Sequence, residues 1–177
     1  MTGRLKGLPP LVNERTVLVI LGSFPGVASL AAQQYYGHPL NHFWPIIEAI
    51  LGSSPHGYCA SSYQNRIDWM LSRGVGLWDV YASCERAGSL DTRIRNAEVN
   101  DFVGLGQRCP ELRVIAHNGG ESFKHASHVT AALGMDDMTN VGVQFFRLPS
   151  SSRANASWGF ARKLEAWREV FAEAGLA

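Results

Sequence analysis

The segment YYGHPLNHFW, residues 35–44, places aromatic rings, two histidines and one carboxamide where a Gly and a Pro predict a loop. From its position alone, Asn41 could cap a helix that starts at His42, because the first-turn amides of a helix have no partner within it.

The rings of the same segment also allow two interpretations. Phe43 and Trp44 are more typical of a hydrophobic core than of a site. Tyr35 and Tyr36 are harder to bury, since each phenol needs a hydrogen-bond partner. The tyrosines are therefore less readily explained as core residues than Phe43 and Trp44.

Short apolar segments, each followed by Gly, Pro, Ser or Asn, predict buried strands at 16–21, 112–116 and 143–148, with a weaker one at 75–81. Helical patterns lie between them, after HPLN and over 99–105. Alternation of this kind predicts a three-layer α/β/α fold with a central, mostly parallel four-stranded sheet. We expect one domain over residues 1–177.

The final helix has the clearest pattern. Phe160, Leu164, Trp167 and Phe171 recur on one face, and the charged residues, among them Lys163, fall elsewhere.

Ligand sites of parallel sheets lie beyond the carboxyl ends of the strands. Small and polar residues follow the predicted strands at 22–26, 78–89, 117–122 and 148–155, which indicates a site built from several loops. GSFPG (22–26) could be only a turn, and it lacks the spacing of a dinucleotide or P-loop site. LPSSSRAN (148–155) could hold a phosphate at the start of the final helix or could simply cap that helix. Asn118 could serve only to adopt a left-handed turn.

Composition narrows the class of protein. The 177 residues, 46% hydrophobic and 18% charged with a net charge of +1, are those of an ordinary globular protein. The longest apolar run is too short to span a bilayer and the first residues lack a signal-peptide core, so we expect a cytoplasmic protein. Cys59, Cys84 and Cys109 are widely spaced, which predicts reduced thiols and no metal site.

The order GSFPG, YYGHPLNHFW, LPSSSR resembles the uracil-DNA glycosylase superfamily over most of the chain. Mismatch-specific members carry G-x-N-P-G, then aromatic-A-H-P-x-N-x-F-W, then a late N-P-S or M-P-S-S-S loop. Their catalytic Asn of the first motif falls at Phe24 here. The chain is more similar to the hypoxanthine (deoxyinosine) DNA glycosylase branch, which has G-S-x-P-G and uses the Asn of H-P-x-N, and this maps onto Asn41.

The resemblance implies a role for each motif. Asn41 would position the attacking water, and Tyr36 would stack on a base pulled out of the helix. Because an amide can orient water but hardly deprotonate it, the implied hydrolysis would be dissociative and would rely on stabilising the departing base. Asp79 stands where uracil-reading relatives have an Asn, so it would either read an altered base or only cap a loop. The residues implied to bind the base are Tyr36, Phe24, Asp79 and Ser23. Those implied to contact DNA, with Ser152 or Arg153 filling the gap left by the base, are Pro149, Ser150, Ser151, Ser152 and Arg153.

The implied function is a monofunctional DNA glycosylase of base-excision repair that hydrolyses the N-glycosidic bond of deaminated bases, above all hypoxanthine. We expect a monomer whose partner is damaged DNA, with no membrane, metal or cofactor. No Lys is close in sequence to the proposed loops, so no lyase activity is expected. The alternatives are a mismatch-specific uracil or thymine glycosylase and a non-catalytic nucleic-acid-binding relative.

Overall fold

A four-stranded parallel sheet with the order β3-β2-β6-β7 forms the centre of the computed structural model, which describes residues 3–52, 62–134 and 142–177. β2 and β3 are buried along their whole length, as expected of parallel strands covered on both faces. All four predicted strands are confirmed, with ends shifted by at most two residues. Their bounds are β2 Leu18–Gly22, β3 Val75–Asp79, β6 Val114–Asn118 and β7 Gln144–Leu148.

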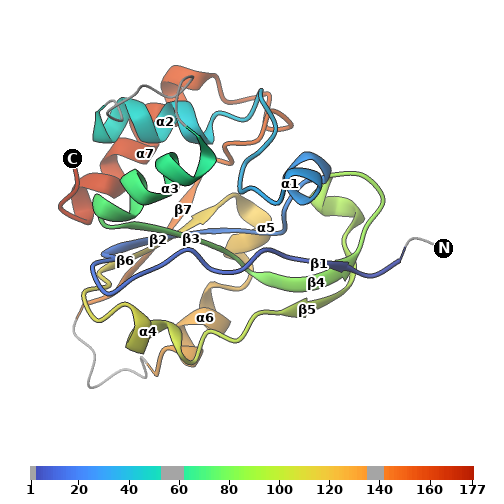
Figure 1. The fold of residues 1–177 in the computed structure, drawn as a ribbon, viewed down its shortest axis with the longest axis horizontal. Helices are drawn as coiled ribbons and strands as arrows, with labels where there is room; N and C mark the ends of the chain where they lie inside the picture. Colours follow the sequence, from blue (N-terminus) through green and yellow to red (C-terminus); the bar gives the residue numbers. More distant parts are fainter. Residues whose placement is uncertain (1–2, 53–61, 135–141) are drawn as a thin grey trace.

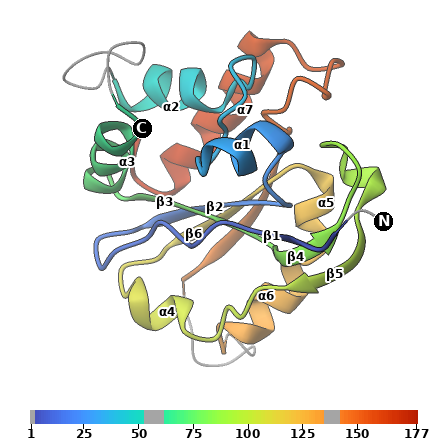
Figure 2. The same cartoon turned by 45° about the vertical axis from the view of Figure 1, so that its right-hand side comes forward.

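Helices cover both faces of this sheet, which confirms the predicted three layers (Figures 1 and 2). One face carries α2 (Phe43–Leu51), α3 (Tyr63–Ser72) and α7 (Phe160–Glu173), and the other carries α4 (Leu105–Arg108) and α6 (Ala126–Ala132). Two short helices, α1 (Val27–Ala32) and α5 (Gly120–Phe123), follow the carboxyl ends of β2 and β6.

Side-chain alternation along β2 builds a separate core on each face. Leu18 and Ile20 pack into the cluster beneath α2, α3 and α7, whereas Val19 and Leu21 pack into the cluster on the α4 and α6 side. The two cores hold the sheet rigid, so the loops at its carboxyl edge have a fixed base.

A second, antiparallel sheet was not predicted. It has the order β1-β4-β5, formed by β1 (Leu5–Lys6), β4 (Tyr81–Glu85) and β5 (Arg95–Val99), with the 3₁₀ helix η1 (Asp91–Arg93) between the last two. The predicted strand 75–81 is therefore divided between two sheets. The predicted helix 99–105 is wrong, because Asn100 N–H bonds to the Val80 carbonyl and its Nδ2 to the Asp79 carbonyl, which continues the strand pairing.

The final helix differs from its prediction in which face is buried. Trp167 and Phe171 are buried as expected, but Lys163 is fully buried and Phe160 is 38% exposed. Lys163 precedes Trp167 by four residues, so it shares the face that the prediction assigned only to apolar residues.

Two further expectations concern the oxidation state of the cysteines and the presence of membrane-spanning helices. Cys84 and Cys109 are free and buried, which confirms reduced thiols at these positions; Cys59 lies outside the described residues. Within the described ranges, every helix is too short or too polar to cross a membrane.

Candidate active site

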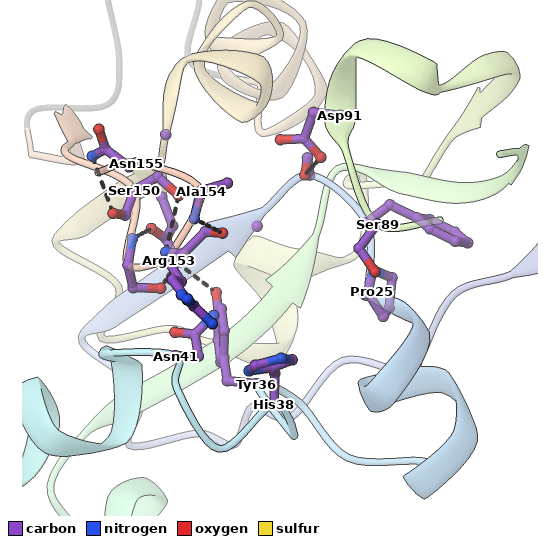
Figure 3. A pocket seen from close by; sticks show the side chains of 18 of the residues that line it. Pro25, Tyr36, His38, Asn41, Ser89, Asp91, Ser150, Arg153, Ala154 and Asn155 are labelled. Atoms are coloured by element: carbon purple, nitrogen blue, oxygen red, sulfur yellow. Dashed lines mark hydrogen bonds between the residues drawn. The ribbon is translucent and has the colours of Figure 1, made fainter. Parts of the chain in front are cut away.

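A cavity of about 960 Å³ opens at the carboxyl edge of the parallel sheet. All four loops predicted to converge contribute to its lining, together with part of the segment 35–44. Figure 3 shows Tyr36, His38 and Asn41 on one side with Arg153 beside them, and Pro25, Ser89 and Asp91 across the opening. The cavity is large enough for a nucleotide.

Asn41 bonds to the start of α2 and also lines the cavity. Its Oδ1 accepts the N–H of Phe43 at 2.9 Å, which starts α2 at Phe43 rather than at His42. The side chain is nevertheless half-buried and lines the cavity. Because an amide oxygen has two lone pairs, one remains for a water molecule in the cavity, and the bond to Phe43 fixes the orientation of the group.

Tyr36 presents an aromatic face from the same segment. Its ring stacks on the buried Phe43 with centroids 3.8 Å apart and planes 13° from parallel. Its backbone has a φ of 53°, an uncommon conformation that turns the side chain into the cavity wall. Phe43 covers one ring face, so the platform can take a base only on the other.

Tyr35 and Trp44 hold this segment in place through hydrogen bonds. The Tyr35 hydroxyl donates to the Pro9 carbonyl at 3.0 Å, and Trp44 Nε1 donates to the Tyr35 carbonyl at 3.2 Å. Trp44 and Phe43 are therefore core residues, as predicted, and Tyr35 joins them.

Asn118 is a site residue whose role the sequence analysis missed. Its Nδ2 donates to the Tyr36 hydroxyl at 3.0 Å and to Ser151 Oγ at 2.9 Å, and its Oδ1 accepts the Ser151 N–H at 2.8 Å. The left-handed turn expected at Asn118 is instead at Gly119, with a φ of 105°. The sequence feature that could have indicated this role is the position of Asn118 at the carboxyl end of a buried strand, where ligand sites of parallel sheets lie.

The Ser-rich loop, residues 149–153, is not at the start of the final helix as predicted. α7 begins at Phe160, and neither Ser nor Asn caps it, since Gly159 is its N-cap. Instead the loop is held by its backbone carbonyls. Trp167 Nε1 donates to Pro149, the His42 N–H to Ser151 and Lys163 Nζ to Ser152, at 3.0, 3.1 and 2.9 Å.

Within the Ser-rich loop the side chains divide into two groups. Ser151 is 1% exposed and bonded to Asn118, so we assign it to holding the loop rather than to contacting DNA. Arg153 is exposed at the rim, and Pro149, Ser150 and Ser152 are partly exposed and line the cavity.

Lys163 corrects the premise that no lysine is near these loops. Its ammonium group is buried and bonded to the Ser152 carbonyl, and burial lowers its pKa. The two ion pairs of the described residues are Arg4–Glu98 and Lys124–Glu121, so this cation has no carboxylate partner there. An expectation of no lyase activity now depends on the burial of Lys163.

In an assay of base release from damaged DNA, the activity that the resemblance implies, we expect Lys163→Met to slow the reaction about tenfold while shifting Tm by only a few degrees. The loop loses one of its backbone anchors, whereas removal of an unpaired buried cation offsets that loss in stability. Single-turnover assays and thermal melts measure both quantities, with Lys124→Met, an exposed lysine, as the control. An unchanged rate would show that the other anchors alone position the loop.

Asp79 ends β3 and is opposite Gly22 in the register of the sheet. Its side chain lines the cavity and is 4% exposed, and no hydrogen bond from the described residues reaches its carboxylate. The buried Oδ2 therefore caps no backbone N–H of the described residues, and the base-reading role stays a prediction.

Ser23 and Phe24 line the cavity beside Asp79. The Ser23 hydroxyl donates to Asp91 Oδ1 at 2.7 Å, so its proton is already engaged. Phe24 is 6% exposed, and the Arg86 guanidinium lies 5.1 Å from its ring centroid. Phe24 therefore offers a ring edge or face to a ligand and no hydrogen bond.

Comparison with known proteins places this site in a family. No family model matches the chain. The sequence is 36% identical over 166 residues to hypoxanthine DNA glycosylases of Methanosarcina barkeri and Methanosarcina acetivorans, covering 94% of this chain and 97% of each relative. A solution NMR structure from Methanosarcina acetivorans, provisionally named a uracil DNA glycosylase, matches with a TM-score of 0.79 and 32% identity over 98% of this chain and 99% of that chain.

The fold is that of the uracil-DNA glycosylase superfamily, as the resemblance implied. The sequence identity to the Methanosarcina relatives extends over nearly the whole chain, so it shows the family within this superfamily. The chain belongs to the hypoxanthine DNA glycosylase family, whose members are hydrolases that act on N-glycosyl bonds.

Proposed function

We propose that this protein hydrolyses the N-glycosyl bond of deoxyinosine in DNA and releases hypoxanthine. The observation that carries the proposal is the meeting of Asn41 and Tyr36 in one cavity at the sheet edge. The relatives named for this activity support the choice of base.

The bond that breaks joins C1′ of the sugar to N9 of the purine. The nucleotide is flipped into the cavity, its base stacks on the free face of Tyr36, and a water molecule donates a hydrogen bond to Asn41 Oδ1. That contact leaves a water lone pair aimed at C1′ as the sugar develops oxocarbenium character. Since an amide does not remove the proton, the base departs first and takes the electron pair of the C1′–N9 bond; water then bonds to C1′, and the proton that it loses passes to the departed base or to solvent.

Base recognition in this proposal falls to the residues around Asp79. Asp79 reads the polar edge of the base, Phe24 adds apolar contact, and the half-buried Ser23 orients Asp91 beside them. The groups named here need no metal or cofactor to act.

The Ser-rich loop contacts DNA from the rim of the cavity. Arg153 or Ser152 fills the space left by the flipped nucleotide, and Pro149 and Ser150 press against the backbone. Extrusion costs a few kcal/mol and is easiest at mismatched pairs, which favours deaminated bases. We also propose a cytoplasmic monomer without lyase activity.

Where Ser152 is the residue that fills the gap, Arg153 contacts phosphate, and Arg153→Ala should weaken binding to inosine-containing and undamaged duplexes by similar factors. Loss of one phosphate contact should also reduce the slope of log affinity against log salt by about 1. Anisotropy titrations at several salt concentrations measure both. Arg15→Ala, an exposed arginine in the loop that precedes β2, is the control. A slope equal to that of the wild type would remove Arg153 from the interface.

The test of the function is a base-release assay on duplexes containing hypoxanthine, uracil, thymine or xanthine. We expect hypoxanthine to be released fastest, with an abasic site left in an unbroken strand. Preferred release of uracil or thymine would favour a mismatch-specific glycosylase. Binding to inosine DNA without any abasic product would favour a non-catalytic relative.

A further inference from the structure

The carboxyl group of Asp79 is deep in the cavity, against the backbone of Gly22. A β-carbon on Gly22 would lie 2.2 Å from Asp79 Oδ1 and 3.4 Å from the Tyr36 hydroxyl. Only glycine at position 22 therefore lets the carboxyl group occupy this place between the first strand and the aromatic platform.

The surroundings of Asp79 disfavour a negative charge. Its Oδ2 is buried and has no hydrogen-bond partner among the described residues. The positive charge of Arg86 acts on this carboxyl group, but Arg86 donates to the Pro25 carbonyl and forms no ion pair with Asp79. The titratable groups that face Asp79 come from η1, the end of β4, the segment before α2, and α3: Asp91, Arg86, Tyr35, Tyr36 and Tyr63.

Burial is the largest effect on this carboxyl group and raises its pKa, and the neighbouring Asp91 raises it further. Arg86 acts in the opposite direction, and the resulting pKa of Asp79 is about 7. Asp79 is therefore largely protonated below neutral pH and ionised above it.

We propose that Asp79 reads the flipped base as a neutral carboxylic acid, and so selects bases with an N–H beside a C=O on the recognition edge. This inference rests on the proposed function and names the edge of the substrate that the site accepts. Hypoxanthine presents that edge through N1–H and O6.

A neutral carboxylic acid can form two parallel hydrogen bonds with this edge of the base. Its carbonyl oxygen accepts N1–H while its hydroxyl donates to O6. An ionised carboxylate has only acceptors, so one oxygen would face O6 with no proton between them. The ionised form instead suits the adjacent N1–H and N2–H donors of guanine, an undamaged base. Guanine carries the same N1–H and O6, so this contact alone does not separate it from hypoxanthine, and rejection of guanine depends on the cost of extruding a base from a matched pair.

The pH dependence of hypoxanthine release from an inosine duplex, measured at saturating enzyme in single turnover, tests the proposal. For the wild type we expect a constant rate below about pH 7 and a fall approaching about tenfold per pH unit above it. Asp79→Asn places an amide donor and acceptor in the same positions. That variant should keep a measurable rate that does not change between pH 6 and 8. Asp68→Asn, on the exposed side of α3, is the matched control and should retain the wild-type profile.

Thermal melting supplies a readout independent of activity. A folded carboxyl whose pKa is raised holds a proton that the unfolded chain has lost, so its contribution to stability declines as pH rises from about 4 to 7. Asp79→Asn should therefore match the wild-type Tm near pH 4 and exceed it at pH 8.

The outcomes separate this inference from the proposed function. A wild-type rate independent of pH from 6 to 8, a folded but inactive Asp79→Asn, or the same alkaline fall in that variant would overturn the neutral-acid reading. In each of these cases the wild type still releases hypoxanthine. Absence of hypoxanthine release by the wild type at every pH would instead overturn the proposed function.

Discussion

Asn41→Ala is expected to slow hypoxanthine release from an inosine-containing duplex roughly 100- to 10,000-fold, the range for a group that positions a reactant in the transition state. The methyl group cannot accept a hydrogen bond from water, so the nucleophile loses its orientation toward C1′. Binding of the duplex should change little, since Tyr36 and the Ser-rich loop remain. Single-turnover rates and anisotropy on the same duplex measure the two effects separately.

The helix-starting bond of Asn41 requires a control for stability. Loss of the acceptor for the Phe43 N–H costs about 1 kcal/mol. Asn41→Ser retains an acceptor for that N–H but holds water from a different position, so its Tm should stay near that of the wild type while its rate falls as in Asn41→Ala. Near-normal release by either variant would show that Asn41 only starts the helix.

Tyr36→Ala should reduce hypoxanthine release about 100-fold. Stacking of a base on an aromatic ring contributes about 1–3 kcal/mol, and the alanine also removes the ring that covers Phe43. Loss of the Tyr36 hydroxyl leaves Asn118 bonded to Ser151, so the Ser-rich loop should keep its anchor. Fluorescence of a base analogue at the target position reports flipping, and quench-flow reports release.

Tyr36→Phe is the matched variant, because it keeps the ring and removes only the hydroxyl that accepts from Asn118. We expect a rate within about threefold to tenfold of the wild type, the effect of one lost neutral hydrogen bond. If Tyr36→Phe were as impaired as Tyr36→Ala, the hydroxyl network rather than stacking would be the function of this residue.

Much of the fold follows from local patterns. The strands β2, β6 and β7 are short apolar runs bounded by turn residues, and their order along the chain implies a parallel sheet. The convergence of loops at its carboxyl edge follows from that topology, so the general position of the cavity was predictable. The roles of Asn41 and Tyr36 came from the resemblance, not from periodicity.

The remaining features depend on contacts between distant segments. β4 and β5 pair through backbone hydrogen bonds, and no side-chain pattern in their sequences predicts this pairing. The segment 99–105 was therefore predicted to be a helix. Lys163 is buried because its ammonium group meets the Ser152 carbonyl, and no charge pattern within α7 reveals that partner. Asn118 joins Tyr36 to Ser151 across three separate segments, a geometry that only the folded chain defines.

A crystal structure of Asn41→Ser bound to a duplex with one deoxyinosine tests the central claim most directly. The account predicts a flipped hypoxanthine on the free face of Tyr36, with its N1–H and O6 toward Asp79 and C1′ near position 41. A base that remains stacked in the duplex, or that binds outside this cavity, would contradict it.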